Sequence, residues 1–244
     1  GYTLHYSVPY GYWLMSFDTS QYAYHQSLAG IVQNVTYSGE SRTTAVRLSR
    51  MLRRDATSKT RAHLAAWLRS SSNHIDGNEV EIQRRRMAGL ELGIQQHAYL
   101  RQGEFTVGIR YRHGAGALGA IAAPEEATGE GTAKPRYFKV EARAGWPFEL
   151  AGFALRYDGV LRGQWSKTPL VPQDRFAIGG RYTVRGFDGA SLLSGDHGWL
   201  LRNEISTAMP FDAQTIYLGL DHGVVSGQST RTLSGKSLTG AVLG

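Results

Sequence analysis

The sequence contains no cysteine and no long hydrophobic run, and both absences restrict the class of protein it can encode. Without cysteine there is no disulfide framework, which fits a bacterial envelope protein but does not by itself identify a compartment. No stretch approaches the roughly 20 apolar residues that a membrane-spanning helix needs. The mean hydropathy of −0.32 is also too polar for helical spans. If the chain crosses a membrane, it must do so as β-strands.

Sequence signatures of enzymes and metal sites are missing as well. There is no Gly-x-x-x-x-Gly-Lys-Ser/Thr loop for a nucleotide and no Gly-x-Ser-x-Gly elbow for a nucleophilic serine. No two histidines have the i, i+4 spacing of a helical metal site; His97, His113, His197 and His222 are far apart in the sequence. We therefore expect no catalytic residue, no metal and no cofactor.

No signal peptide opens the chain, and its first residues already alternate between polar and apolar. We therefore expect it to be the middle of a longer protein. The net charge of +7 would suggest nucleic acid or anionic lipid as the partner of a soluble domain. The basic run Arg84–Arg86 could form a nucleic-acid patch, but a strand would point Arg85 to the opposite face from its two neighbours. The three charges would then not form one patch. Near the end of a barrel the run would contact lipid head groups or lipopolysaccharide phosphates.

Alternation with period two is the dominant pattern that is present, and it predicts strands with one apolar and one polar face. Phe105, Val107, Ile109 and Tyr111 share one face, for example, with charged residues opposite. The same parity places a set of basic residues on the polar face: Arg110, Arg112, Arg143, Arg156 and Arg162. The polar face would meet water in a soluble sandwich and line the lumen of a membrane barrel, so alternation alone leaves both open.

The spacing of the strands favours the barrel. Short connections near residues 9–11, 55–58, 101–103, 148–151 and 209–213 alternate with longer ones at 25–39, 114–135 and 166–198. Short turns at one end and long loops at the other are typical of outer-membrane barrels. The strands run to about ten residues, enough to cross a bilayer when tilted. We therefore predict an all-β, antiparallel transmembrane β-barrel that occupies residues 1–244.

About eleven strands can be counted, and an odd number cannot close a bacterial barrel, so we expect a fragment. The predicted strands begin near Tyr2, Tyr12, Ser41, Lys59, Asn78, Glu104, Arg136, Gly152, Gly198, Gln214 and Leu238. Aromatic residues gather near strand ends, where interfacial girdles would lie. They include Tyr10, Tyr12, Trp13, Trp146, Phe148, Trp165 and Trp199.

The long connection at 166–198 contains the most informative motif, Val184-Arg185-Gly186-Phe187. Glycines on either side of Arg185 permit tight bends, and the apolar bulk of Phe176, Tyr182 and Phe187 would be poorly solvated in water. We therefore expect this loop to fold inward. Arg185 would then need a carboxylate, and parity supplies Asp221 and Glu204 on the lumen face. Alternatively, Arg185 is a solvated surface group and Asp221 an ordinary lumen carboxylate.

The Val-Arg-Gly-Phe motif resembles the loop motif of the outer-membrane insertase superfamily, and the wider set of motifs resembles the TpsB transporters of two-partner secretion. The segments that carry the resemblance are Val8–Trp13, Ser38–Ser41, Gly163–Ser166, Pro169–Leu170, Phe176–Arg181 with Gly179 and Gly180, Val184–Phe187 with Gly186, Gly195–Trp199, Arg202–Glu204 and Tyr217–Gly223. These segments are spread along the chain, and the resemblance extends over nearly its full length.

The resemblance implies a pore in the outer membrane of a Gram-negative bacterium that secretes a TpsA-type exoprotein, such as a haemolysin, adhesin or contact-dependent toxin, in unfolded form. It implies a sixteen-stranded barrel, of which this chain would supply about strands 4–14. The plug helix, the two POTRA domains, the first three strands and the last two would lie outside it. It also makes Asp221 the preferred partner of Arg185, with the pair locking the inward loop. An insertase-type assembly factor and a passive porin remain as alternatives.

Overall fold

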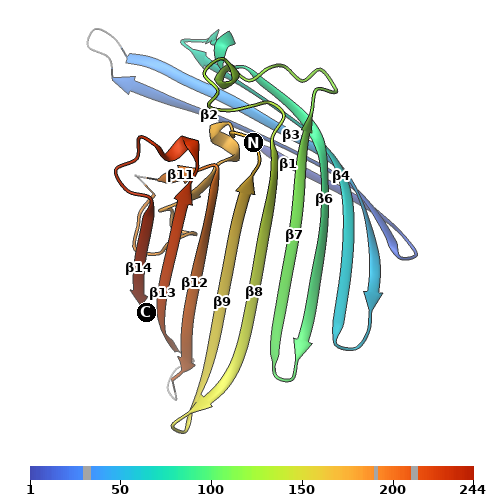
Figure 1. The fold of residues 1–244 in the computed structure, drawn as a ribbon, viewed down its shortest axis with the longest axis vertical. Helices are drawn as coiled ribbons and strands as arrows, with labels where there is room; N and C mark the ends of the chain where they lie inside the picture. Colours follow the sequence, from blue (N-terminus) through green and yellow to red (C-terminus); the bar gives the residue numbers. More distant parts are fainter. Residues whose placement is uncertain (30–33, 190–191, 210–213) are drawn as a thin grey trace.

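In the part of the chain that the structure describes, eleven long strands form one antiparallel sheet in which each pairs with the long strands before and after it (Figure 1). The computed structural model describes residues 1–29, 34–189, 192–209 and 214–244. The strands of the sheet are β1 Tyr2–Tyr10, β2 Trp13–Ala29, β3 Asn34–Arg54, β4 Ser58–Ile75, β6 Arg85–Leu100, β7 Gly103–Ala115, β8 Arg136–Leu150, β9 Phe153–Ser166, β12 His197–Ala208, β13 Thr215–Ser226 and β14 Ser237–Leu243. The predicted all-β antiparallel fold and its count of long strands are confirmed.

The remaining elements are short. Strand β5 (Asn78–Glu79) folds back on β4, and β10 (Phe176–Ile178) pairs with β11 (Leu193–Gly195) in a separate small hairpin. Single 3₁₀ turns lie at η1 Glu81–Gln83, η2 Pro124–Ala127, η3 Pro172–Asp174 and η4 Gln228–Thr230. In the described part of the chain, no helix is long and apolar enough to cross a membrane.

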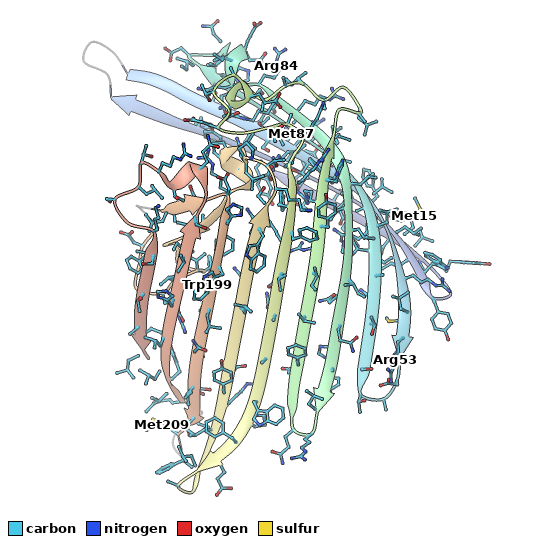
Figure 2. The ribbon with its side chains drawn as sticks, viewed as in Figure 1. Met15, Arg53, Arg84, Met87, Trp199 and Met209 are labelled. Atoms are coloured by element: carbon cyan, nitrogen blue, oxygen red, sulfur yellow. The ribbon has the colours of Figure 1, made fainter. Side chains whose placement is uncertain are left out.

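Short and long connections lie at opposite ends of the sheet. Arg53 and Met209 mark the end with short turns, whereas Arg84 lies at the end with long connections (Figure 2). The predicted short connection at 209–213 falls mostly on residues 210–213, which lie outside the described residues. In outer-membrane barrels the short turns face the periplasm and the long loops face outward, which orients this sheet.

The two faces of the sheet differ in chemistry because side chains alternate along each strand. On one face Leu64, Leu92 and Leu218 are at least half exposed, as expected of residues that meet lipid. The opposite face is charged and hollow, and a cavity there is lined by residues from β3 to β8 that include Arg47, Arg61, Glu91, Arg110, Glu141 and Arg143. A cavity shared by so many adjacent strands requires the sheet to curve around its polar face.

One predicted connection and one predicted strand start were wrong. The loop expected at residues 25–39 is largely β-structure, because β2 continues to Ala29 and β3 begins at Asn34, with the two strands in continuous register. The paired backbones of the two strands satisfy each other's hydrogen bonds there, so the strands continue where a loop was predicted. Only the two-residue strand β5 begins at Asn78, and the long strand predicted to begin near there, β6, begins at Arg85.

A tight turn explains the second error. Asp76 and Gly77 both adopt positive φ angles, of 49° and 82°, which suits a two-residue hairpin turn. The chain therefore reverses at once onto β4 as strand β5 and then forms the turn η1. Residues 76–84 consequently connect β4 to β6, and the part of them from Asn78 onward was predicted to belong to the long strand.

The two faces predict opposite responses to a new arginine at adjacent positions of β4. Leu64→Arg places the charge on the lipid face and should destabilise the full-length protein by about 2–4 kcal/mol if the site is near the bilayer midplane. His63→Arg places the same side chain on the polar face beside Glu91, which His63 Nε2 approaches at 3.3 Å, and should be nearly neutral. Urea unfolding in lipid vesicles measures both. Equal destabilisation would contradict the assignment of faces.

Candidate functional site

The connection between β9 and β12 folds onto the polar face of β12, β13 and β14 through an apolar cluster. Ile178 and Val184 of this connection, Leu200 of β12 and Val225 of β13 are fully or almost fully buried together. Partly buried hydrophobic residues surround them, namely Phe176, Phe187, Leu193, Leu233 and Leu238. Burying this apolar surface stabilises the inward position of the loop.

Glycines in the facing strands leave room for the loop. A Cβ atom at Gly223 would lie 3.0 Å from Ile178 Cγ2 and 3.1 Å from Val184 Cγ2. A Cβ atom at Gly219 would collide with the guanidinium group of Arg185, and one at Gly240 would collide with the Arg185 carbonyl oxygen. These three positions therefore allow the backbone of the loop to approach the strands closely.

The turns on either side of Arg185 also depend on glycine. Gly179 and Gly186 adopt φ angles of 101° and 92°, in the region that side chains other than glycine rarely occupy. The backbone N–H groups of Gly179 and Gly180 both donate to Thr183 Oγ1, at 3.0 and 2.9 Å. The Thr183 hydroxyl donates in turn to the Gly180 carbonyl oxygen at 2.8 Å. A compact turn thereby presents Arg185 to the strands.

Arg185 is held by Asp221 in a two-pronged contact. Its Nε donates to Asp221 Oδ2 at 2.7 Å and its Nη2 donates to Oδ1 at 2.8 Å. The backbone N–H of Arg185 adds a third hydrogen bond to the same carboxylate at 3.0 Å. This planar fork is the geometry in which guanidinium binds carboxylate best, and ammonium could not reproduce it.

Two further acceptors complete the site. Nη1 of Arg185 donates to Glu204 Oε2, and Nη2 donates to the carbonyl oxygen of Asn203 at 3.0 Å. Arg202 Nε lies 3.7 Å from Asp221 Oδ2, so two guanidinium groups face two carboxylates and the local charge is balanced. The Asp221 carboxylate is fully buried, whereas the Glu204 side chain remains 32% exposed. Asp221 is therefore the deeper of the two partners of Arg185.

The structure thus brings together most of the residues that the sequence singled out. Arg185, Asp221 and Glu204 are in direct contact, and Val184, Phe187 and Gly223 lie in or beside the apolar cluster. One expectation was wrong: Tyr182 does not contribute buried bulk, since its side chain is 73% exposed. Its carbonyl oxygen instead accepts a long hydrogen bond from Arg202 Nη1 at 3.4 Å.

All five arginines expected in the lumen lie on the polar face, and most are near carboxylates. Arg112 binds Glu91, with Nη2 at 2.7 Å from Oε2. Arg143 and Arg162 both approach Glu141, at 2.7 and 3.8 Å. Arg156 pairs with Asp158 and Glu104. Arg110 lines the cavity and forms no ion pair within the described residues.

A second anchor of the same connection was missed by the sequence analysis. Asp174 of η3 is almost fully buried and accepts two hydrogen bonds from Arg69 of β4, from Nη1 at 2.9 Å and from Nη2 at 2.7 Å. The Tyr137 hydroxyl approaches the same carboxylate at 3.4 Å, and Gln164 binds the Asp174 carbonyl oxygen at 2.9 Å. Parity places Arg69 on the polar face, but nothing in the sequence links it to a residue 105 positions away.

An apolar cluster surrounds this second anchor. Trp67, Met87, Ala123, Ala133 and Val171 are buried together, and they join β4 and β6 to the connections that follow β7 and β9. Figure 2 shows Met87 near the end of the sheet where these long connections gather. Arg112 lies over the ring of Trp67 at 4.8 Å, a favourable cation–π distance. The connection between β7 and β8 is therefore packed over the same polar face as the connection between β9 and β12.

This architecture defines a class. A curved antiparallel sheet that is apolar outside and charged inside, with a long connection folded onto the charged face, is a transmembrane β-barrel protein of the outer-membrane type. A family model described as "Haemolysin secretion/activation protein ShlB/FhaC/HecB" matches residues 1–244, and the chain belongs to this family. The predicted family and the outer-membrane location are confirmed.

Curated relatives agree with this assignment. The chain is 32% identical over its whole length to the outer membrane transporter CdiB-2 of Burkholderia pseudomallei, and it covers 42% of that protein. It is 27% identical over 209 residues to the hemolysin transporter protein HpmB of Proteus mirabilis, which is 84% of this chain and 36% of the relative. The chain therefore spans less than half the length of these relatives.

Solved structures show the same fold. CdiB from Acinetobacter baumannii superposes with a TM-score of 0.86 at 32% identity, over 99% of this chain and 42% of that one. CdiB from Escherichia coli gives a TM-score of 0.87 at 23% identity, over 99% of this chain and 45% of that one. The second similarity supports the fold alone.

Filling the space at Gly219 should release Arg185. Gly219→Val would push the guanidinium group away from Asp221 and Asn203, and the segment 176–189 should exchange its amide hydrogens faster in the full-length protein. Gly235→Val serves as the matched control, because no atom lies within 4 Å of a Cβ at that position. Unchanged exchange in Gly219→Val would show that the close approach is not needed to hold the loop.

Removing Arg69 should loosen the second anchor. Arg69→Met leaves the buried Asp174 carboxylate without its cation, a change that costs about 3–5 kcal/mol for a fully buried pair. We expect faster protease cleavage within residues 116–135 and 167–175. Arg61→Met, which removes a lumen-lining arginine of the same strand without an ion pair in the described chain, is the control. Equal rates of protease cleavage in the two variants would contradict a role of Arg69 in holding these connections.

Proposed function

We propose that this chain is the pore-forming part of an outer-membrane transporter that secretes a large TpsA-type exoprotein, in the manner of two-partner secretion. Its family membership supports the transport class, as do the names of its relatives, which are the outer membrane transporter CdiB-2 and the hemolysin transporter proteins HpmB and ShlB. The observation that carries the mechanism is the contact of Arg185 with Asp221 and Glu204 on the inward loop. The proposed partner is thus a secreted haemolysin, adhesin or contact-dependent toxin.

The inward loop acts in this proposal as a lock on the pore. Arg185 and Asp221 fasten it to β13, next to the apolar cluster that packs it against β12–β14. Removing one partner would leave an uncompensated charge, at a cost of about 3–5 kcal/mol for a fully buried pair and less in a wet lumen. The lock therefore depends on both members of the pair.

The exoprotein would pass through in unfolded form. Charged and polar groups line the cavity of the polar face, and Arg47, Arg61 and Arg110 give it a basic character that favours anions and offers polar contacts to a passing chain. The sequence has no phosphate-binding loop for nucleotide hydrolysis. Folding of the exoprotein outside the cell is the driving force we propose, and the chain itself would catalyse no reaction.

We also propose that residues 1–244 form one part of a larger barrel domain, in which the described sheet would supply about strands 4–14 of sixteen. The connection at 166–198 would then be the inward loop of that barrel. The share of the relatives that the chain covers is consistent with this placement. Choice of the exoprotein would lie in periplasmic POTRA domains.

Charge reversal tests the lock and the transporter together. In the full-length protein with a co-expressed TpsA-type exoprotein, Arg185→Asp and Asp221→Arg should each reduce secretion at least tenfold, while the barrel still assembles. The double exchange should recover part of the secretion, because the ion pair returns in reverse but Glu204 then faces an aspartate. Secreted exoprotein is measured by immunoblot of the medium, and barrel assembly by heat-dependent migration on gels.

Two further variants sharpen this test. Arg185→Lys retains the charge but loses the fork, so it should give intermediate secretion. Arg231→Asp reverses an exposed charge in the next long connection and should secrete normally. Normal secretion in every Arg185 and Asp221 variant would remove the lock from the proposal.

The alternatives predict different results. A passive porin needs no lock, so its conductance would not respond to charge reversal at Arg185, whereas a released loop should raise it. An insertase-type assembly factor would impair the assembly of other barrels when it is depleted, with no exoprotein retained in the periplasm. Family membership favours the transporter over both.

A further inference from the structure

The outward face of β7, β8 and β9 carries two adjacent rows of unlike chemistry. Tyr111, Phe138 and Trp165 are direct partners across the three strands, since Tyr111 pairs with Phe138 and Phe138 pairs with Trp165. One pleat further, His113 pairs with Arg136. The backbone N–H of Lys167 donates to the Arg136 carbonyl oxygen at 2.7 Å, which continues this second row onto the end of β9. An aromatic row is therefore followed directly by a basic row.

The aromatic row belongs to the membrane surface of the protein. The rings of Tyr111 and Phe138 lie 4.5 Å apart, centroid to centroid, and Trp165 remains half exposed. Below it the same face continues with apolar side chains, among them Ile109 and Val140. Aromatic residues at the border between apolar and polar zones mark the level of the lipid head groups.

The basic row lies just beyond that border, at the end of the sheet with long connections. Arg136 and Lys167 are both exposed. Lys167 Nζ lies 5.9 Å from the centroid of the Phe138 ring, so its charge is held against the aromatic row. Long loops are extracellular in outer-membrane barrels, so the basic row faces the outer leaflet.

The two cations of this row, Arg136 and Lys167, have no carboxylate partner among the described residues. Four of the five predicted lumen arginines lie within 4 Å of a carboxylate. Arg136 and Lys167, by contrast, form no ion pair with any residue that the structure describes. Two unpaired cations side by side repel each other unless an anion lies between them. The anion available at that depth of the membrane is a lipid phosphate.

We propose that His113, Arg136 and Lys167, together with Tyr111, Phe138 and Trp165, form a docking surface for a phosphorylated glycolipid of the outer leaflet. The phosphate groups bind the basic row, with the planar guanidinium group of Arg136 as the directional donor. The acyl chains lie against the aromatic row and the apolar side chains below it. This surface is independent of the secretion mechanism, because it lies on the opposite face of the sheet from the Arg185 site.

Binding of lipid A to the full-length, detergent-solubilised protein tests the proposal. Bisphosphorylated lipid A and its dephosphorylated form are titrated separately, and bound lipid is counted by native mass spectrometry. Wild type should bind the phosphorylated form more tightly. Each surface cation contributes about 1 kcal/mol to binding an anionic lipid, so Arg136→Gln with Lys167→Gln should weaken binding roughly thirty-fold. The dephosphorylated form should be unaffected by this double change.

A matched variant separates a site from a net-charge effect. Arg54→Gln with Arg101→Gln removes the same charge at the end with short turns and should leave lipid A binding unchanged. Equal losses in the two double variants would overturn the proposal, as would equal binding of the two lipid forms by wild type. Secretion is measured in parallel. A secreting protein that shows no preference for the phosphorylated lipid would refute this surface and leave the transporter intact.

Discussion

The requirement that every backbone polar group within the bilayer has a partner governs the rest of this structure. Lipid offers no hydrogen bonds, so each strand must pair along its length, and consecutive strands achieve this through a simple meander. Pairing fixes the pleat, and the pleat sends alternate side chains outward and inward. The apolar outer face, the charged cavity and the positions available to an inward loop all follow from that alternation.

The inner face then has to satisfy a dense set of charges. Several arginines there lie close to carboxylates, as Arg112 does to Glu91 and Arg185 to Asp221. A buried guanidinium group without such a partner would be costly. The same rule explains why the inward connection is attached through ions as well as through apolar packing: a loop that enters a charged interior must present groups that compensate the charges it covers.

Features that depend on local sequence could be predicted, and those that depend on distant partners could not. Alternation identified the strands and their faces, and the glycines around Arg185 identified the loop. The alternation of side chains along the strands that follow the loop places two carboxylates, Asp221 and Glu204, on the lumen face. These two were therefore the predicted partners of Arg185. Asp174 and Arg69 offered no comparable restriction, since the curvature of the whole sheet brings them together. The far ends of β2 and β3 pair with each other from residues 25–29 to residues 34–38, and neither segment's sequence shows that pairing by itself.

The two anchors of the β9–β12 connection lie on strands that are far apart in the sheet. Asp174 is bound to β4, and Arg185 is bound to β13, with β6, β7, β8, β9 and β12 between them. A connection attached at both places spans the polar face and ties its two sides together. The connection cannot swing out of the interior unless at least one of these two attachments breaks. Movement of Arg185 away from Asp221 would leave residues 167–175 fastened to β4, so any opening in which only the Arg185 contact breaks is confined to the part of the loop beyond η3.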